Sequence, residues 1–383
     1  MTAPAPGISG AATPASIFQR LILPGLAFKA VVIGGGYATG RELAEFFLPQ
    51  GPRGGLLAML LATVLWSLVC ALTFALARRW QTLDYRAFFE ALLGRGATIF
   101  EIAYLLFLVL ILAVFGAAAG AIGAAVFGWP SLAGTLLLVF GILAVASFGN
   151  SSVERLFKWA SIVLYAVYAL FALLALTRFG DRISAHLALT TIAPAWPVGG
   201  LTYAGYNIIG AVVILPVVRH MTGDRDAVVA GLLAGPLAMI PGLLFFLAML
   251  AFYPEIGAAT LPSDYLLTRL NLPVLHLLFQ TMIFVALLES GTGIVHAVNE
   301  RIANARGAHR HDRRWRAMVT AVLLVGSIFL ATRFGLVALI ANGYALLAYV
   351  LLAIYVLPLV TVGAWWIWRG KAADSTQLSG SIP

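Results

Sequence analysis

Residues 30–42, AVVIGGGYATGRE, form the most unusual segment of an apolar run that spans about 21–48. Three consecutive glycines, Gly34 to Gly36, lie near the middle of this run, and Gly40 follows them. Each glycine costs a helix roughly 1 kcal/mol relative to alanine, so the triplet predicts an unwound point inside a helix. Small residues also let two helices pack closely, but that pattern spaces them four apart, as Gly36 and Gly40 are. The contiguous triplet therefore favours a break.

The whole chain is far more apolar than a soluble domain. Of its 383 residues, 62% are hydrophobic and only 10% are charged, whereas soluble domains average about 45–50% and roughly 25%. Helices of about 20 apolar residues that cross a lipid bilayer account for this composition. The runs are long and continuous, unlike the alternating segments of about ten residues that build a β-barrel. An all-α polytopic membrane protein is therefore expected.

Ten apolar runs of helical length predict ten transmembrane helices. They lie at about 21–48, 54–77, 97–127, 131–148, 153–178, 198–218, 227–253, 271–300, 316–332 and 336–368. The last run is long enough for one span preceded by a short helix to Asn342, or for two spans. Between the second and third runs, Tyr85–Leu93 predicts a short interfacial segment.

The positions of Arg and Lys predict the orientation in the membrane. These residues concentrate around 78–95 and 301–316, which fall on the same side if ten helices are counted. We therefore expect a multi-pass protein of the bacterial cytoplasmic (inner) membrane with both termini in the cytoplasm, and no cleaved signal peptide. The net charge of +9 and the dense run Arg306–Arg316 are interpreted as this topological bias rather than as a nucleic-acid site.

A second interrupted span lies five runs after the first. Residues 199–210 read GGLTYAGYNIIG, and Pro216 follows them. Interrupted segments in corresponding positions of two halves are the best sequence indication of a transporter site. Five spans per half would make the second copy inverted. The predicted organisation is a mobile tail, a five-helix repeat, an external connection, a second five-helix repeat and a mobile tail, over 1–19, 20–178, 179–197, 198–368 and 369–383.

The stretch IGGGYATGRE at 33–42 resembles the first-helix signature of the YkvI-type bacterial membrane proteins, of the amino acid–polyamine–organocation superfamily. Tyr203–Asn207 and Glu289–Gly293 match the polar points expected on helices 6 and 8. The resemblance implies a leucine-transporter-like fold, a five-plus-five inverted repeat with broken helices 1 and 6. It further implies a central site between those helices and alternating access. Sodium-coupled relatives hold an ion between helices 1 and 8.

The expected function is secondary active transport of a small polar or zwitterionic solute, such as an amino acid. Amides near the two breaks would meet its carboxylate. The predicted substrate-binding residues are Gly34, Gly35, Gly36, Tyr37, Ala38, Thr39, Tyr203, Tyr206 and Asn207. The expected partners are this solute, the bilayer and a coupling proton or sodium ion, with no cofactor, metal or nucleic acid. Hydrolase, zinc and phosphate-loop motifs are not found, so an enzyme is not expected. A channel and a non-transporting membrane sensor remain alternatives.

Charged residues inside apolar runs are functional candidates because a charge there is expensive. Lys29 precedes the glycine triplet by five residues, and Glu289 lies in the eighth run. The resemblance makes their helices neighbours, so we expect the two side chains to face each other. The ammonium would replace a sodium ion and Glu289 would carry the coupling proton. Alternatively, Lys29 extends to the interface and Glu289 only bonds a neighbouring helix.

The hydroxyls of Ser290 and Thr292 lie beside Glu289 in sequence. In sodium-coupled relatives such hydroxyls bind the ion, but Lys29 would repel it. Proton coupling or exchange is therefore favoured over sodium coupling. The predicted coupling and gating residues are Lys29, Glu289, Ser290 and Thr292.

Arg41, Glu42 and Glu45 follow the break on its outer side. They would form either an external gate or a solvated helix end, and we expect the solvated end. Tyr104 and Phe115 of the third run are within reach of the central site, although packing is the simpler role for both.

Overall fold

The computed structural model describes residues 15–148, 150–305 and 312–369, and it describes no side chains at 146–161 and 299–317. All regular structure in these ranges is helical. The tails predicted to be mobile fall almost entirely outside the described residues. The side chains of the basic run Arg306–Arg316 also lie outside them.

The first half of the chain contains helix 1 in four pieces and then four long helices. Its elements are η1 Phe18–Ile22, α1 Leu23–Val32, α2 Gly35–Ala38, α3 Arg41–Phe46, η2 Leu48–Gln50, α4 Pro52–Trp80, α5 Tyr85–Leu93, η3 Gly94–Gly96, α6 Ala97–Phe127, α7 Ser131–Phe148 and α8 Asn150–Arg178. The predicted interfacial segment is α5, and the side chain of Asp84 caps it by accepting from the Ala87 amide at 3.0 Å.

The second half begins after the connecting helix α9, Gly180–Leu187. Its elements are α10 Trp196–Asn207, α11 Gly210–Val213, η4 Leu215–His220, α12 Asp224–Leu250, η5 Glu255–Ala258, α13 Pro262–Leu270, α14 Pro273–Ala305, α15 Asp312–Ala338, η6 Leu339–Tyr344, α16 Ala345–Leu351, η7 Leu352–Val356 and η8 Leu359–Gly363. The chain turns at Gly335, whose φ is +74°. Residues 336–368 then continue as one helical segment, so the last run is a single span with no break at Asn342.

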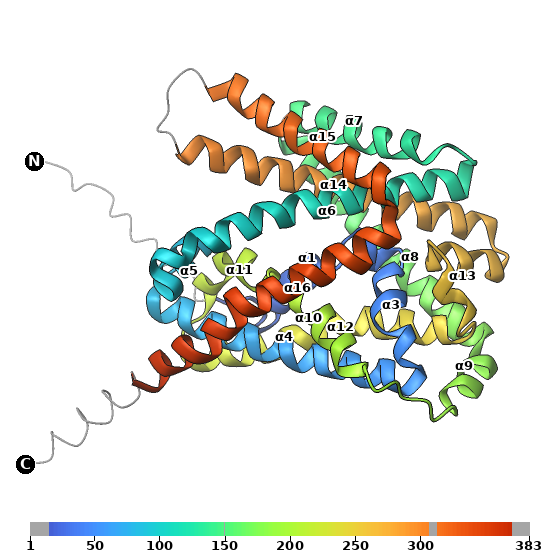
Figure 1. Cartoon of the computed structure of the whole chain (residues 1–383), viewed down its shortest axis with the longest axis horizontal. Coiled ribbons are helices and arrows are strands. Elements are labelled where there is room, and N and C mark those ends of the chain that lie inside the picture. The colour runs from blue at the N-terminus through green and yellow to red at the C-terminus, as the bar shows by residue number, and fades with distance from the viewer. Residues whose placement is uncertain (1–14, 149, 306–311, 370–383) are drawn as a thin grey trace, which may run out of the picture.

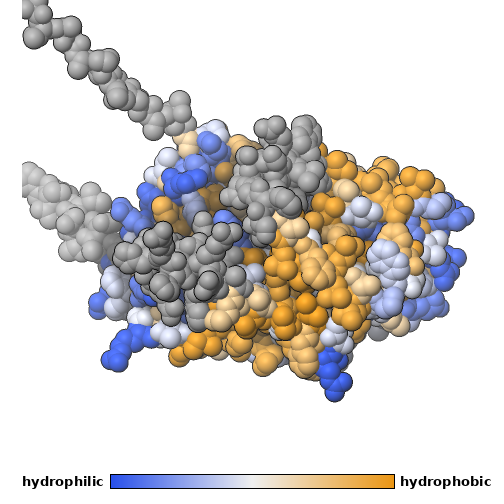
Figure 2. All heavy atoms as spheres, turned by 90° about the horizontal axis from the view of Figure 1, so that it is seen from above, coloured by the Kyte–Doolittle hydropathy of each residue, from blue (hydrophilic) through white to orange (hydrophobic). Residues whose placement is uncertain are grey.

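The described helices occupy all ten predicted runs. Within the described ranges, five helical segments are individually long and apolar enough to cross a membrane, or six if α8 and α9, bent by 73°, form one span. Helix 1 comprises η1, α1, α2 and α3, and helix 6 comprises α10, α11 and η4. Neither meets that criterion because each is divided into short pieces. Figure 2 shows a broad apolar band across the middle of the molecule with polar surface at both ends, as a bilayer requires.

The two halves pack as expected for an inverted repeat, because the first helix of each half packs on the second helix of the other. Helix α1 packs on α12, and its counterpart α10 packs on α4. The second helices of the halves, α4 and α12, cross closely because Gly231 faces the backbone of Ala71 and Gly235 faces Ser67. The Ser67 hydroxyl donates to the Leu232 carbonyl at 2.9 Å across this crossing.

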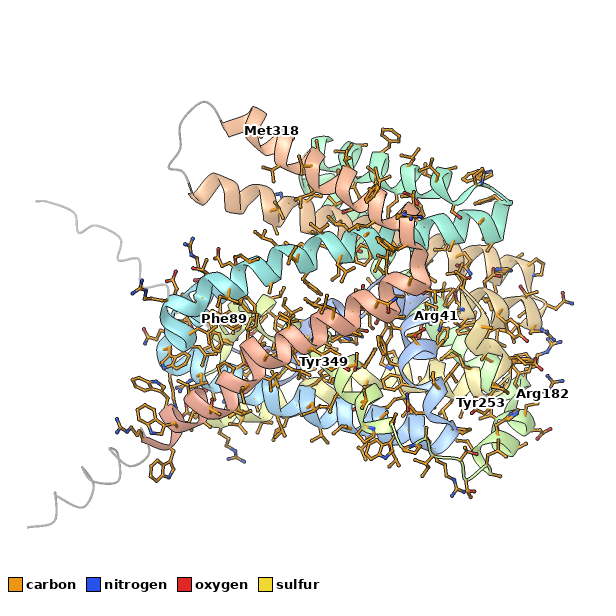
Figure 3. The ribbon with its side chains drawn as sticks, viewed as in Figure 1. Arg41, Phe89, Arg182, Tyr253, Met318 and Tyr349 are labelled. Carbon is orange, nitrogen blue, oxygen red and sulfur yellow. The ribbon has the colours of Figure 1, made fainter. Side chains whose placement is uncertain are left out.

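Helices 1 and 6 lie at the centre of this arrangement. A second group of helices, α6, α7, α14 and α15, packs together beside them, and the short α2 contacts both α6 and α14 (Figure 1). We call the end of the molecule formed by α9 and α13 the outer end, and the end formed by η1 and α5 the inner end. Figure 3 places Arg41 on the outer-end side with Arg182 and Tyr253, opposite Phe89.

Candidate functional site

Helix 1 is broken where the glycine triplet begins. Ile33 leaves the helical conformation with ψ +76°, and Gly34 is extended with φ −95° and ψ −169°. A new helical turn, α2, starts at Gly35. A second irregularity follows at Gly40, whose left-handed φ of +80° precedes α3. The predicted break is therefore confirmed, and it is followed by a bend.

Close neighbours on three different elements surround the three glycines, and a side chain at Gly35 or Gly36 would collide with them. A β-carbon at Gly34 would lie 3.4 Å from the Phe115 ring, and one at Gly35 would collide with Leu287. One at Gly36 would collide with the side chain of Glu42. Phe115 therefore reaches the break, as expected. Tyr104 instead packs with Tyr85 of α5, with ring centroids 4.9 Å apart.

The interruption of helix 6 is milder. Helix α10 ends at Asn207, and α11 begins at Gly210. Ile208 and Ile209 keep nearly helical angles, but the amides of Ala211 and Val212 bond three residues back, to Ile208 and Ile209, at 2.9 and 3.1 Å. Helix 6 is thus tightened by 3₁₀-type bonds rather than opened into extended chain.

Glu42 and Tyr206 join the two broken helices. The Tyr206 hydroxyl donates to Glu42 Oε2 at 2.6 Å, and Glu42 is only 3% exposed. The Tyr206 ring stacks on Tyr344 of η6, with centroids 4.4 Å apart. Tyr206 therefore reaches the helix 1 break through Glu42, an acidic residue expected from the sequence at a solvated helix end.

The other predicted helix 6 residues lie on different sides of α10. Tyr203 is fully buried against Phe47 and Trp66, and its hydroxyl has no hydrogen-bond partner in the described structure. The Asn207 side chain donates to the Tyr203 carbonyl one turn earlier, at 3.1 Å. It caps its own helix rather than linking to helix 1.

The remaining predicted residues of helix 1 face three directions. The Tyr37 hydroxyl donates to the Ala238 carbonyl of α12 at 3.3 Å. The Thr39 hydroxyl donates to the Gly36 carbonyl at 2.9 Å, and the Thr39 carbonyl accepts from the Ser263 amide of α13, also at 2.9 Å. Ala38 lines a cavity of about 170 Å³ with Ile33, Tyr165 and Tyr168. This apolar cavity directly adjoins the break.

On the inner side of the break, the Lys29 side chain contacts the aromatic ring of Tyr165. Its Nζ lies 4.1 Å from the centroid of Tyr165 on α8, a cation–π geometry. Glu289 is within electrostatic range of the same tyrosine. The two charged residues thus share Tyr165 as a neighbour, and their direct pairing stays a prediction. Thr292 donates to the Leu288 carbonyl of its own helix at 2.7 Å, and Ser290 is half-buried.

Arg41 and Glu42 do not form a solvated helix end, so that expectation is wrong. Arg41 is 4% exposed, and its guanidinium donates to the carbonyls of Gly257 and Ala259, each at 2.8 Å. It also pairs with Glu45 at 2.9 Å. Residues 255–263 therefore contact α3 and help to bury the Arg41 side chain. The position of Glu42 in the sequence could have indicated its burial. It lies six residues before the end of the first apolar run, inside the run rather than beyond it.

Sequence comparison gives one relative of unestablished function. No protein-family model matches the chain. Over 331 residues it is 23% identical to the uncharacterized membrane protein YkvI of Bacillus subtilis strain 168, covering 85% of this chain and 91% of that protein.

Solved structures show the fold. MhsT in complex with L-phenylalanine matches with a TM-score of 0.55 at 17% identity, covering 91% of this chain and 96% of that one. A Na⁺-coupled sialic acid symporter matches at 0.52 and 13% identity, over 90% and 86%. A mutant form of the manganese transporter of Eremococcus coleocola matches at 0.51 and 15%, over 88% and 77%. The chain therefore has the leucine-transporter-like fold with broken helices 1 and 6.

Proposed function

We propose that this protein is a secondary active transporter that moves a small polar or zwitterionic solute, such as an amino acid, by alternating access. The extended backbone at Gly34 carries the proposal. Non-helical backbone at membrane depth is tolerated only where it lies inside protein or lines a cavity. Here it lies between α6 and α14, close to the tightened turn of helix 6.

The substrate site that we propose consists of Gly34 to Thr39 of helix 1 together with Tyr203, Tyr206 and Asn207 of helix 6. Of these residues, Ala38 also lines the apolar cavity of about 170 Å³ beside the break. Of the similar solved proteins, one is in complex with L-phenylalanine, one is a sialic acid symporter and one is a manganese transporter. The fold alone therefore leaves the solute open, and the amino acid assignment is the part that needs testing.

Coupling to protons is preferred to coupling to sodium in this proposal. The Lys29 ammonium occupies the inner side of the break, over Tyr165 and near the helix that carries Glu289, Ser290 and Thr292. A fixed positive charge there opposes a sodium ion between helix 1 and the eighth span, α14. Sodium-coupled symport remains the second candidate, because one similar solved structure is a Na⁺-coupled symporter.

Alternating access would open one end at a time, and both ends are tied in this structure. At the outer end, α3 is bonded to the segment 255–263 through Arg41 and Thr39. At the inner end, Arg20 pairs with Asp226 at 2.7 Å, and Arg78 and Arg79 pair with Asp224 at 2.6 and 2.7 Å. We propose that these two sets of contacts are the outer and inner gates.

A thermal-shift screen of purified protein tests the binding step. The twenty amino acids and related small amines and acids are screened at two pH values, with sodium or potassium as the salt cation. A solute present at 100 times its Kd stabilises the protein by about 2.7 kcal/mol. At least one solute should raise the melting temperature in sodium buffer and in potassium buffer, and Tyr206→Phe should weaken that rise. If no solute stabilises the protein, the proposed substrate class is wrong; a shift only in sodium favours the sodium-coupled alternative.

A further inference from the structure

The side chain of Glu42 is a buried acid without a basic partner in the described structure. Its Oε2 accepts from the Tyr206 hydroxyl at 2.6 Å, and the carboxyl lies against Gly36 of the helix 1 break. Its neighbour Arg41 points away from it, toward Glu45 and the carbonyls of Gly257 and Ala259. Glu42 therefore lies inside the proposed substrate site and is the carboxyl group of that site.

The groups around this carboxyl are the Tyr206 hydroxyl and the Tyr37 backbone amide, which bond it, and further tyrosine and apolar side chains. Tyr206 and Tyr203 come from α10, Tyr344 from η6 and Tyr37 from α2, and all four are within electrostatic range of Glu42. From α12, Phe245 packs against Gly40 at the base of α3. No Lys, Arg or His side chain of the described residues is among these neighbours. The donors to the acid are thus one tyrosine hydroxyl and one backbone amide, and both are uncharged.

A carboxylate in such surroundings is stable only when something compensates its charge. Moving an isolated carboxylate out of water is very costly, so a buried acid either takes up a proton or pairs with a cation. A hydroxyl and a backbone amide carry no net charge, and the site encloses the acid almost completely. The nearby tyrosines bring no positive charge that would oppose such a cation.

We propose that Glu42 binds the ammonium group of the transported solute and holds a proton whenever the site lacks that group. Binding then exchanges one for the other: the O–H bond of the carboxylic acid breaks, the proton leaves to water, and the ammonium pairs with the carboxylate. This inference rests on the proposed function and narrows it. The solute carries a primary ammonium group, as an amino acid or a simple amine does, and its entry is coupled to proton exit.

Proton release on binding tests the exchange. The full-length protein in lipid nanodiscs, in weakly buffered solution with a pH-indicator dye, is titrated with methylammonium chloride, which is the ammonium group alone. The expected result is close to one proton released per protein molecule at saturation. Sodium acetate, the carboxylate group alone, should release none. Absence of proton release by the wild type at saturating methylammonium would overturn the proposal.

Two variants separate a specific role of Glu42 from a general effect. Glu42→Gln keeps the shape but cannot exchange a proton, so release should disappear and methylammonium affinity should fall roughly 10- to 100-fold. Asp181→Asn changes an exposed acid of α9, outside the proposed gates, and should behave as the wild type. Release that persists in Glu42→Gln contradicts the inference, even if the solute screen shows that the protein binds amino acids. The two proposals therefore fail separately.

Should Glu42→Gln fail to fold, the wild-type protein still gives a decisive reading. Infrared difference spectra with and without methylammonium report the carboxylic acid directly. Loss of a protonated-carboxyl band on binding supports the exchange, and an unchanged band contradicts it.

Discussion

The two halves of helix 1 carry their charges in opposite environments. The inner half, η1 and α1, has Arg20 and Lys29, whose side chains remain partly exposed and contact Asp226 and the Tyr165 ring. The outer half, α2 and α3, has Arg41 and Glu42, which are 4% and 3% exposed. The contacts of the inner half are therefore partly exposed, so water can replace a lost partner. The charged side chains of the outer half are buried, so water cannot replace one there.

This difference indicates how the two ends respond to perturbation. Removing a partner from a buried polar contact leaves the other group without water or protein, so the loss is large. Removing a partner from a half-exposed contact lets water take its place, so the loss is small. Variants of the outer half should accordingly destabilise the protein more than variants of the inner half.

The largest effect is expected from Gly40→Ala at the start of α3. The φ of +80° disfavours any side chain, and the new methyl group would collide with the Phe245 ring. The two costs together predict a loss of about 2–5 kcal/mol in the free energy of unfolding. Thermal unfolding of the purified protein measures it. Gly94→Ala is the matched control, because its φ is +56° but nothing lies within 4 Å of the added carbon. Equal losses in both variants would contradict the role of Phe245.

A smaller effect is expected from Arg41→Gln. The variant loses both bonds to the carbonyls of Gly257 and Ala259, which predicts a destabilisation of about 1–3 kcal/mol. Hydrogen exchange should rise in residues 255–263 and stay unchanged at the inner end. Arg53→Gln, an exposed arginine at the outer end, should change neither. Unaltered exchange in 255–263 would show that Arg41 does not hold this segment.

Lys29→Gln should cost less still, about 0.5–2 kcal/mol from the lost cation–π contact. Its more informative result concerns sodium. If the Lys29 ammonium excludes sodium from the space between helix 1 and α14, the variant should gain a sodium-dependent rise in melting temperature that the wild type lacks. Tyr165→Leu keeps the ammonium and should show no such rise. Sodium stabilisation of the wild type itself would refute this explanation.

The smallest effect is expected from Arg20→Gln at the inner end. Arg20 is 31% exposed, and Asp226, although only 10% exposed, keeps its hydrogen bonds from the Thr222 amide and hydroxyl, so the loss should cost about 0.2–1 kcal/mol. High salt screens such a pair, and the difference from the wild type should shrink accordingly. A loss as large as that of Arg41→Gln would erase the contrast between the two halves.

The sequence predicts the architecture well because apolar length and glycine placement are local properties. The run boundaries, the break at Gly34 and the segment Tyr85–Leu93 all follow from residues near each other in the chain. The environment of Glu42 does not, because its neighbours come from α10 and η6, more than 160 residues away. Arg41 appeared solvated for the same reason: the segment 255–263 that covers it is remote in sequence.

The inner side of the site shows a second limit of sequence reasoning. The pairing of Lys29 with Glu289 stays a prediction, but nothing in the sequence indicates that Tyr165 contacts Lys29. The structure places Tyr165 of α8 over the Lys29 ammonium. An aromatic ring in an apolar run carries no signal that separates a cation–π partner from ordinary packing.

Solute-driven proton movement in proteoliposomes tests transport and its coupling together. Vesicles that contain the full chain and a trapped pH dye receive each of the twenty amino acids on the outside, with protein-free vesicles and the Glu42→Gln variant alongside. The account predicts that at least one amino acid makes the lumen more alkaline in wild-type vesicles only, because entry of the solute drives protons out. Uptake of amino acids without any change in lumenal pH, or an equal change with Glu42→Gln, would contradict it.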